Sequence, residues 1–224
     1  MLLDALLEVI HPTRCAGCDL PGELFCAACL ADMPLVLLES ACVHCGAPFG
    51  TLTCTECWNR TFSFEAARCM GSLERPLSRA LTLYKDGGER RLASVFASML
   101  VGTLGAWAGW ADAVVAVPAS DAAKIRRGFD HMALIASGVA RAWEVPLIPA
   151  LRVRAAADQR RLGRDARRAN AATSLHLVSG TAVPHRIVLL DDVVTTASTA
   201  EAASAVLLDA GATEVRVGAL ARAW

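Results

Sequence analysis

Arg186-Ile-Val-Leu-Leu-Asp-Asp-Val-Val-Thr-Thr-Ala-Ser-Thr-Ala200 carries the strongest signal of fold in this chain of 224 residues. Its apolar run, 187–190, predicts a strand that is buried on both faces. Two acids, Asp191 and Asp192, end the predicted strand, and a hydroxyl-rich turn at 195–199 leads into a helical stretch. Backbone N–H groups and the positive end of that helix favour phosphate, while the acids suit sugar hydroxyls or a hydrated Mg²⁺. The stretch therefore predicts a site for a sugar phosphate.

Downstream of about residue 72, apolar runs of strand length alternate with stretches of helical periodicity. Such alternation is typical of a parallel sheet whose crossover connections are helices. Gly211 stands where the last predicted helix ends, as glycine does at many helix C-termini. The predicted helices cover 90–104, 130–143 and 200–208, and the predicted strands cover 113–117, 187–190 and 214–220. We therefore expect an α/β domain with a parallel sheet flanked by helices.

The stretch from Leu92 to Ala111 is uncharged and long enough for a hydropathy scan to take it for a membrane span. Its large apolar side chains follow helical spacing from Leu92 to Leu104, and small residues such as Ala97 lie on the opposite side. Two glycines then interrupt the pattern. We expect a buried helix that packs on the sheet, without membrane insertion.

Eight of the nine cysteines form four Cys-x-x-Cys pairs within the first 57 residues. Each pair can direct two thiolates at one ion, and two pairs complete a tetrahedral Zn²⁺ site. The pairs also form a repeat, because a proline follows the first and the third pair at the same distance. The repeat favours two Zn²⁺ sites in sequence, and pairing of the first turn with the third is the alternative. The predicted zinc ligands are Cys15, Cys18, Cys26, Cys29, Cys42, Cys45, Cys54 and Cys57.

Disulfide or redox chemistry explains these cysteines less well. A disulfide scaffold needs an oxidising compartment, but residues 1–10 carry Asp4 and Glu8 in place of the basic start of an export signal. They predict a short packing helix instead. A redox Cys-x-x-Cys usually occurs once, beside a βαβ pattern. We expect two structural zinc ions in a cytoplasmic protein, with His44 facing solvent and Cys69 a small buried residue.

The cysteine-rich part is acidic. Residues 1–70 contain three arginines, no lysine and eight acids, a formal charge of −5 that leaves +5 for the rest of the chain. Each Zn²⁺ held by four thiolates adds about −2, which disfavours contact with a phosphate backbone. We therefore expect a cysteine-rich module, residues 1–68, that docks on a larger domain, residues 69–224, or on a protein partner.

The order of strand, Asp-Asp, two residues and Thr-Thr-x-x-Thr resembles the 5-phosphoribosyl-1-pyrophosphate (PRPP) loop of type I phosphoribosyltransferases. The resemblance implies a phosphoribosyltransferase-like fold, a loop that grips the 5'-phosphate, and a catalytic acid pair that holds the ribose hydroxyls where Mg²⁺ accompanies PRPP. The family has glycine at the third loop position, where this chain has Ala197; if φ is positive there, alanine costs about 1 kcal/mol. The implied catalytic acids are Asp191 and Asp192, and the implied PRPP-binding residues are these two with Thr195, Thr196, Ala197, Ser198, Thr199, Ala119 and Ser120, the last two as a pyrophosphate loop.

Further segments narrow the resemblance to the ComF family. Leu83-Tyr-Lys85, Val114-Val-Ala-Val-Pro118 and Arg127-Gly-Phe-Asp130 follow one another in that family's order, behind an N-terminal cysteine module. The third motif usually reads Arg-Gly-Phe-Asn-Gln in the family, and here Asp130 and His131 stand at its last two positions. Resemblance to ComF proteins implies a link to natural competence, DNA uptake and the handling of imported single-stranded DNA.

Residues 152–168 contain seven arginines against Asp158 and Asp165, a net charge of +5. In type I phosphoribosyltransferases a mobile loop at this place closes over pyrophosphate, and the resemblance implies that role here. A basic segment can equally follow the backbone of single-stranded DNA, or form a solvated arginine-rich face. The candidate residues of this flexible loop are Arg154, Arg160, Arg161, Arg164 and Arg167.

Three functions are compatible with these features. The first is a PRPP-dependent phosphoribosyltransferase in nucleotide metabolism. The second is a protein that binds PRPP or another sugar phosphate and serves DNA uptake through partners. The third, a purely structural zinc adaptor, leaves the Asp-Asp loop without a use. Binding is favoured over turnover, because no residue clearly identifies an acceptor base.

Overall fold

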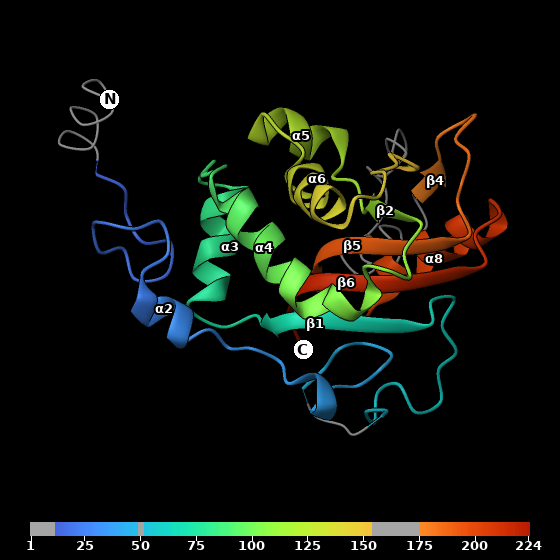
Figure 1. Ribbon diagram of the computed structural model, residues 1–224, viewed down its shortest axis with the longest axis horizontal. Helices are drawn as coiled ribbons and strands as arrows, with labels where there is room; N and C mark the ends of the chain where they lie inside the picture. Colours follow the sequence, from blue (N-terminus) through green and yellow to red (C-terminus); the bar gives the residue numbers. More distant parts are fainter. Residues whose placement is uncertain (1–11, 49–51, 154–174) are drawn as a thin grey trace, which may run out of the picture.

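The computed structural model describes residues 12–48, 52–153 and 175–224, and Figure 1 shows how their elements are arranged. At the centre lies a four-stranded parallel sheet in the order β1-β6-β5-β2. A second, antiparallel pair joins β3 to β4. The strands are β1 (Ala66–Ser72), β2 (Ala113–Ala116), β3 (Leu151–Val153), β4 (Leu175–Leu177), β5 (Arg186–Val194) and β6 (Glu214–Arg222). The predicted α/β class with a parallel sheet is confirmed.

Helices cover both faces of this sheet. The α-helices are α2 (Ala27–Ala31), α3 (Leu77–Lys85), α4 (Leu92–Leu104), α5 (Asp121–Arg127), α6 (His131–Trp143) and α8 (Ser198–Asp209), with short 3-10 turns η1 (Leu38–Ser40) and η2 (Gly105–Trp107). Helices α3, α4 and α6 lie on one face, and α8 with the β3–β4 pair lies on the other. Along β5, Val188 and Leu190 belong to the first core and Ile187 and Leu189 to the second, all fully buried. The prediction that 187–190 is buried on both faces is therefore confirmed.

Strand β5 is longer than the predicted run 187–190, because it continues to Val194. On one side it pairs with β6 as far as Val194, while on the other side its pairing with β2 ends at Leu190. Polar residues are poor strand formers by themselves, so only the neighbouring strand keeps the acids in extended backbone. The two acids thus lie inside β5, at the point where it has lost one neighbour.

Helix α4 is a buried helix of 13 residues, as expected. One detail differs: Ala97 was expected on the side away from the core, yet it is buried. The cause is α6, whose Gly138 lies so near that a Cβ there would come within 2.5 Å of the Cβ of Ala97. Small residues on both helices permit this close approach. Within the described part of the chain, no helix combines the length and the apolar character needed to cross a bilayer.

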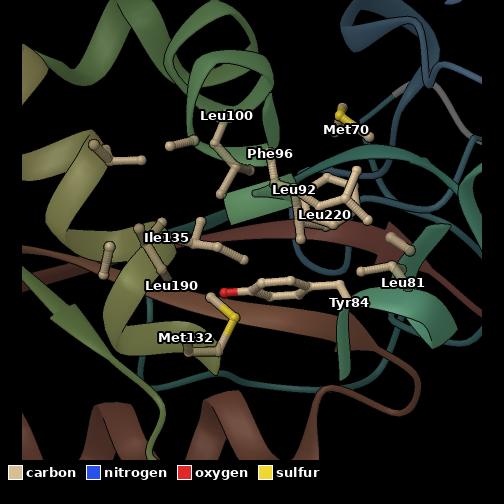
Figure 2. Close-up of a cluster of buried hydrophobic side chains, with 14 of the residues drawn as sticks. Met70, Leu81, Tyr84, Leu92, Phe96, Leu100, Met132, Ile135, Leu190 and Leu220 are labelled. Carbon is tan, nitrogen blue, oxygen red and sulfur yellow. The ribbon is translucent and has the colours of Figure 1, made fainter. Parts of the chain in front are cut away.

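The larger core lies between the sheet and helices α3, α4 and α6, and Figure 2 shows part of it. Tyr84 is its most polar large side chain and is fully buried. Its ring meets Phe96 edge-on at a centroid distance of 5.5 Å, and its hydroxyl points toward α6, where it donates to the carbonyl of His131 at 2.5 Å. This bond joins the end of α3 to the start of α6, next to the acids of β5.

The cysteine-rich module runs along the free edge of β1 (Figure 1). The N–H of Val36 donates to the carbonyl of Met70, and Ser72 donates to Pro34 at 2.8 Å. A sheet edge exposes unpaired backbone groups, and this segment satisfies several of them. Because β1 begins at Ala66, the predicted boundary between residues 68 and 69 falls inside a strand. The division into two domains stays a prediction.

Candidate functional site

The loops that follow β2 and β5 leave the same edge of the sheet, because these two strands are parallel neighbours. Ala119 and Ser120 lie in the first loop, and 195–197 form the second, which leads into Ser198 and Thr199 at the start of α8. In open α/β sheets, ligands bind in the crevice outside the carboxyl ends of the strands. The topology therefore brings the two predicted phosphate-binding segments to one edge.

The second loop presents hydroxyl groups to solvent at the N-terminus of α8. Thr195, Thr196 and Ser198 are exposed, and the hydroxyls of Thr196 and Ser198 lie 2.8 Å apart. The hollow beneath the loop measures about 10 Å³, which is room for one water. A phosphate would therefore sit on the rim of this loop, against the exposed hydroxyls and the first N–H groups of the helix.

Ala197 occupies the left-handed region, with φ 61° and ψ 8°, and it is buried. Alanine pays for this conformation through the clash of its Cβ with the backbone, which glycine avoids. The expected penalty for alanine at position 197 therefore applies, because the backbone there has a positive φ, the conformation that favours glycine.

The pleat of β5 turns the two acids to opposite faces of the sheet. Asp191 is buried, and its Oδ1 accepts a hydrogen bond from the N–H of Asp192 at 2.8 Å. Burial, followed by the nearby charge of Asp192, raises the pKa of Asp191 to about 7. The protonated form of this carboxyl is therefore favoured far above the pH at which an ordinary aspartate loses its proton.

Asp192 has opposite electrostatic surroundings. Its Oδ2 lies 2.5 Å from the ammonium of Lys85, the last residue of α3, and 2.6 Å from Nε2 of His131, the first residue of α6. Burial acts to raise the pKa of Asp192, but the hydrogen bond from His131 and the charge of Lys85 outweigh it and lower the pKa to about 2. Asp192 is thus held as a carboxylate throughout the physiological pH range.

Three residues that join this site were not predicted as site residues: Lys85, Arg127 and His131. Arg127 places Nη1 3.2 Å from Nδ1 of His131, and its Nε lies 3.5 Å from Asp86. They come from α3, α5 and α6, so their distance along the chain from Asp192 hides the contact. The one feature of the sequence that could have identified them as site residues is that each stands in a segment resembling a ComF motif.

The first loop is shaped by helix capping. The hydroxyl of Ser120 accepts from the N–H of Ala123 at 3.3 Å and so begins α5. Asp130 caps α6 in the same way, accepting from Ala133 at 3.2 Å, and its other oxygen meets Lys124. Asp130 therefore has a structural role at the start of α6.

The eight predicted zinc ligands gather in two groups of four. The groups are Cys15, Cys18, Cys26 and Cys29, and Cys42, Cys45, Cys54 and Cys57. The prediction of two sites in sequence is confirmed, and the interleaved pairing is not formed. Within the groups, sulfur–sulfur distances of 3.6 and 3.7 Å are close to the spacing of about 3.8 Å around a tetrahedral ion with Zn–S bonds of about 2.3 Å. The residues fit two structural Zn²⁺ ions.

The backbone favours the thiolate form at one cysteine of each group. Burial acts to raise the pKa of Cys15, but backbone N–H groups, first that of Cys26, lower it to about 6. For Cys42 the same opposition, with the N–H of Cys54 foremost, lowers the pKa to about 7. Zinc binds thiolates, so these N–H groups prepare the ligands for the metal.

His44 differs from expectation. It is half-buried, and its ring stacks on Phe62 with centroids 5.4 Å apart. Apolar contact therefore outweighs solvation for this imidazole. Cys69 is fully buried, as expected, and burial raises its thiol pKa.

The second cysteine group lies against the candidate phosphate loop. Arg60 donates to the carbonyl of Thr196 at 3.1 Å, and Ser63 donates from its N–H and its hydroxyl to Glu201 in the first turn of α8. Arg222, at the end of β6, is buried with one Nη atom 3.7 Å from the sulfur of Cys45 and the other 3.4 Å from the carbonyl of Val194. Arg60 and Ser63, which follow the second cysteine group, thus bond directly to the loop and to α8, and Arg222 links Cys45 to the end of β5.

The arginines predicted to form a flexible loop lie outside the described residues, in the gap between 153 and 175. They are Arg154, Arg160, Arg161, Arg164 and Arg167. Their role in binding pyrophosphate or DNA stays a prediction.

Comparison with known proteins agrees with the cysteine geometry. Residues 6–53 match a family described as double zinc ribbon domain. The chain is also similar to the DNA utilization protein YhgH of Salmonella typhi, with 28% identity over 226 residues that cover 94% of this chain and 97% of the relative. The protein of the same name in Salmonella typhimurium gives the same identity and coverage. The similarity therefore extends from the cysteine groups through the sheet.

Proposed function

We propose that this protein is a ComF-type, phosphoribosyltransferase-like protein that binds PRPP with Mg²⁺ and serves DNA uptake or the handling of single-stranded DNA. The observation that carries the proposal is the carboxylate of Asp192, bound by Lys85 and His131 beside a hydroxyl-rich loop that begins a helix at the carboxyl edge of a parallel sheet. Similarity to proteins named for DNA utilization, over 94% of the chain, supports the context.

The chemistry of the two halves of the site matches the two halves of PRPP. The hydroxyls of Thr195, Thr196, Ser198 and Thr199 and the N–H groups at the start of α8 suit the 5'-phosphate. The acids suit the ribose hydroxyls, and the backbone of Ala119-Ser120 suits the pyrophosphate. Mg²⁺ prefers carboxylate and phosphate oxygens, so the carboxylate of Asp192 together with the pyrophosphate would hold it. When bound, this ion would offset the charge of the pyrophosphate.

Calorimetric titration with PRPP in the presence of Mg²⁺ tests the binding. We expect measurable affinity that falls at least tenfold when Asp191 and Asp192 are both replaced by Asn. Asp209→Asn, at the far end of α8, removes an exposed acid from the same region and should leave affinity unchanged. Wild-type protein that takes up no PRPP would overturn the proposal.

Two further measurements define the biological role. Pyrophosphate release on adding a panel of bases and amines would identify the protein as an active phosphoribosyltransferase in nucleotide metabolism. For DNA, we expect single-strand affinity that weakens with salt and with the triple change Arg160/Arg161/Arg164→Ala, because each lost phosphate contact reduces counterion release. Affinity that the triple change leaves intact would remove the arginine segment from the DNA-binding surface.

A further inference from the structure

A chain of hydrogen bonds stands behind Asp192. Arg127 on α5 meets Nδ1 of His131 at 3.2 Å, and Nε2 of His131 meets Oδ2 of Asp192 at 2.6 Å. The side chain of His131 is 6% exposed and that of Arg127 is 14% exposed. Water therefore competes little for these bonds, and the three groups hold one another in place.

The direction of every bond in this chain follows from Arg127. A guanidinium can only donate hydrogen bonds, so Nδ1 of His131 must be the acceptor. The hydrogen of the neutral ring then lies on Nε2 and is donated to the carboxylate of Asp192. Both ring nitrogens are thereby occupied. His131 has no lone pair left to take a proton from a substrate, so its role is to orient the acid.

The two oxygens of Asp192 are used unequally. His131 and Lys85 both bind Oδ2. Across residues 12–48, 52–153 and 175–224, no hydrogen bond or ion pair ends on Oδ1. An ionised carboxylate offers about four lone-pair sites, so the Oδ1 side keeps its capacity to accept from a ligand.

We propose that Arg127 and His131 are positioning residues that turn Asp192 so that Oδ2 faces helices α3 and α6 and Oδ1 faces the ligand. The inference rests on the proposed function, in which that ligand is the ribose of PRPP. The rigid backing matters because a hydroxyl contact loses strength steeply when the acceptor rotates away from good geometry.

The substitution His131→Gln provides a sharp test, because the amide can accept a hydrogen bond on one side and donate one on the other, as the neutral imidazole does. Its carbonyl oxygen can accept from Arg127, and its NH₂ can donate to Asp192. Methionine fills a similar volume and does neither. We expect PRPP affinity within threefold of wild type for His131→Gln and at least tenfold weaker for His131→Met, both measured calorimetrically with Mg²⁺.

Tyr84→Phe separates orientation from general damage to α6. It removes the hydrogen bond to the backbone carbonyl of His131 but leaves the hydrogen bonds between the side chains of Arg127, His131 and Asp192 intact. We expect Tyr84→Phe to lower the thermal midpoint while PRPP affinity stays within threefold of wild type. If His131→Met binds PRPP as wild type does, the positioning role is overturned while the proposed function stands.

The hydrogen bonds among Arg127, His131 and Asp192 can also be tested by a measurement that does not require PRPP. Long-range ¹H–¹⁵N NMR distinguishes the two neutral histidine tautomers, and we expect His131 to carry its hydrogen on Nε2. Arg127→Met should reduce that preference, whereas Arg126→Met, the neighbouring exposed arginine on α5, should not. A ring that carries its hydrogen on Nδ1 would overturn the inference even in a protein that binds no PRPP.

Discussion

Asp191 and Asp192 are identical neighbours in sequence that the pleat of β5 places in unlike surroundings. Asp191 is buried, and burial raises its pKa to about 7. Asp192 has two donors on one oxygen, and they lower its pKa to about 2. The surroundings thus favour the charged form of Asp192 and the protonated form of Asp191.

The raised pKa of Asp191 predicts a stability that falls as pH rises from 6 to 8. In this window the unfolded chain has already lost the proton, since its carboxyl titrates near 3.8, while the folded protein still binds it below about pH 7. The folded state binds more protons, so the free energy of unfolding decreases with pH, by about 1.4 kcal/mol across the window. Urea unfolding at several pH values measures this slope.

Asp191→Asn removes this contribution, so the variant should have a flatter pH dependence than wild type by about that amount. Asp209→Asn, on the exposed end of α8, should keep the wild-type slope. Equal slopes for wild type and Asp191→Asn would show that Asp191 is ionised across the whole window.

Ala197 predicts a contrast between two substitutions. Ala197→Gly relieves the left-handed strain but loses a buried methyl group and gains freedom in the unfolded chain, so stability should change by less than about 1 kcal/mol. Ala197→Val places a β-branched residue at φ 61° in a buried position and should lose about 2 kcal/mol or more. Chemical denaturation of both variants measures the contrast. A well-tolerated valine would mean that the loop can leave this conformation.

At the scale of elements, strand β6 does more than complete the sheet. Its last residue, Arg222, is 2% exposed and lies against Cys45 of the second cysteine group. Four thiolates around one Zn²⁺ leave a net charge of about −2, and a buried guanidinium offsets part of it. Arg222 therefore links the metal group to the strand beside the candidate loop.

Arg222→Met should lower the free energy of unfolding by about 3 kcal/mol or more, because it leaves buried negative charge without its partner. It should also speed the loss of zinc to a chelator, followed with a colorimetric zinc indicator. Arg216→Met is the control on the same strand; its ion pair with Glu65 is partly exposed, so the loss should be about 1 kcal/mol or less. Unchanged zinc release in Arg222→Met would exclude the electrostatic role.

The elements that the sequence predicted well are those with a strong local pattern. The run 187–190 and the spacing of the cysteines identified the central strand and both metal groups. The end of β5 was missed by four residues, because its pairing with β6 keeps Asp191 and Asp192 extended against their own preference. The burial of Ala97 also came from a neighbouring element, helix α6.

The candidate site was predicted only in part, for the same physical reason. The segment 195–199 follows Asp191 and Asp192 closely in the sequence, so the sequence alone predicted that they lie near one another. Lys85 and His131 reach Asp192 from separate helices, and periodicity within one element carries no information about such contacts. Tertiary packing, which decides them, appears only in the folded chain.

At the scale of the whole molecule, the two cysteine groups contact different parts of the domain. The first group meets α3, where Arg79 donates to the carbonyls of Cys15 and Ala16 at 3.0 and 2.8 Å. The second group meets the end of β6 and the loop before α8. The candidate site lies between α3, which carries Lys85, and that loop. Each cysteine group therefore contacts an element on one side of the candidate site.

Native mass spectrometry should show two Zn²⁺ ions per chain. Removal of zinc should then increase hydrogen exchange at the amides of 195–201, because the bonds from Arg60 and Ser63 depend on a folded second group. Amides in the buried part of β5, such as Leu189, should keep their protection in the same experiment. A loop whose exchange does not respond to zinc would be anchored independently of the metal.

The pleat that separates the two acids also bears on how sequences of this kind can diverge. Position 192 is tied to positions 85 and 131 through a shared oxygen, whereas position 191 meets the loop and the backbone of its neighbour. Substitutions among related chains should accordingly be correlated at 85, 131 and 192, with 131 restricted to residues that can accept on one side and donate on the other. Substitutions at position 191 should be independent of those at the other three positions. The two acids, which look like one motif in the sequence, would then belong to two different groups of correlated positions.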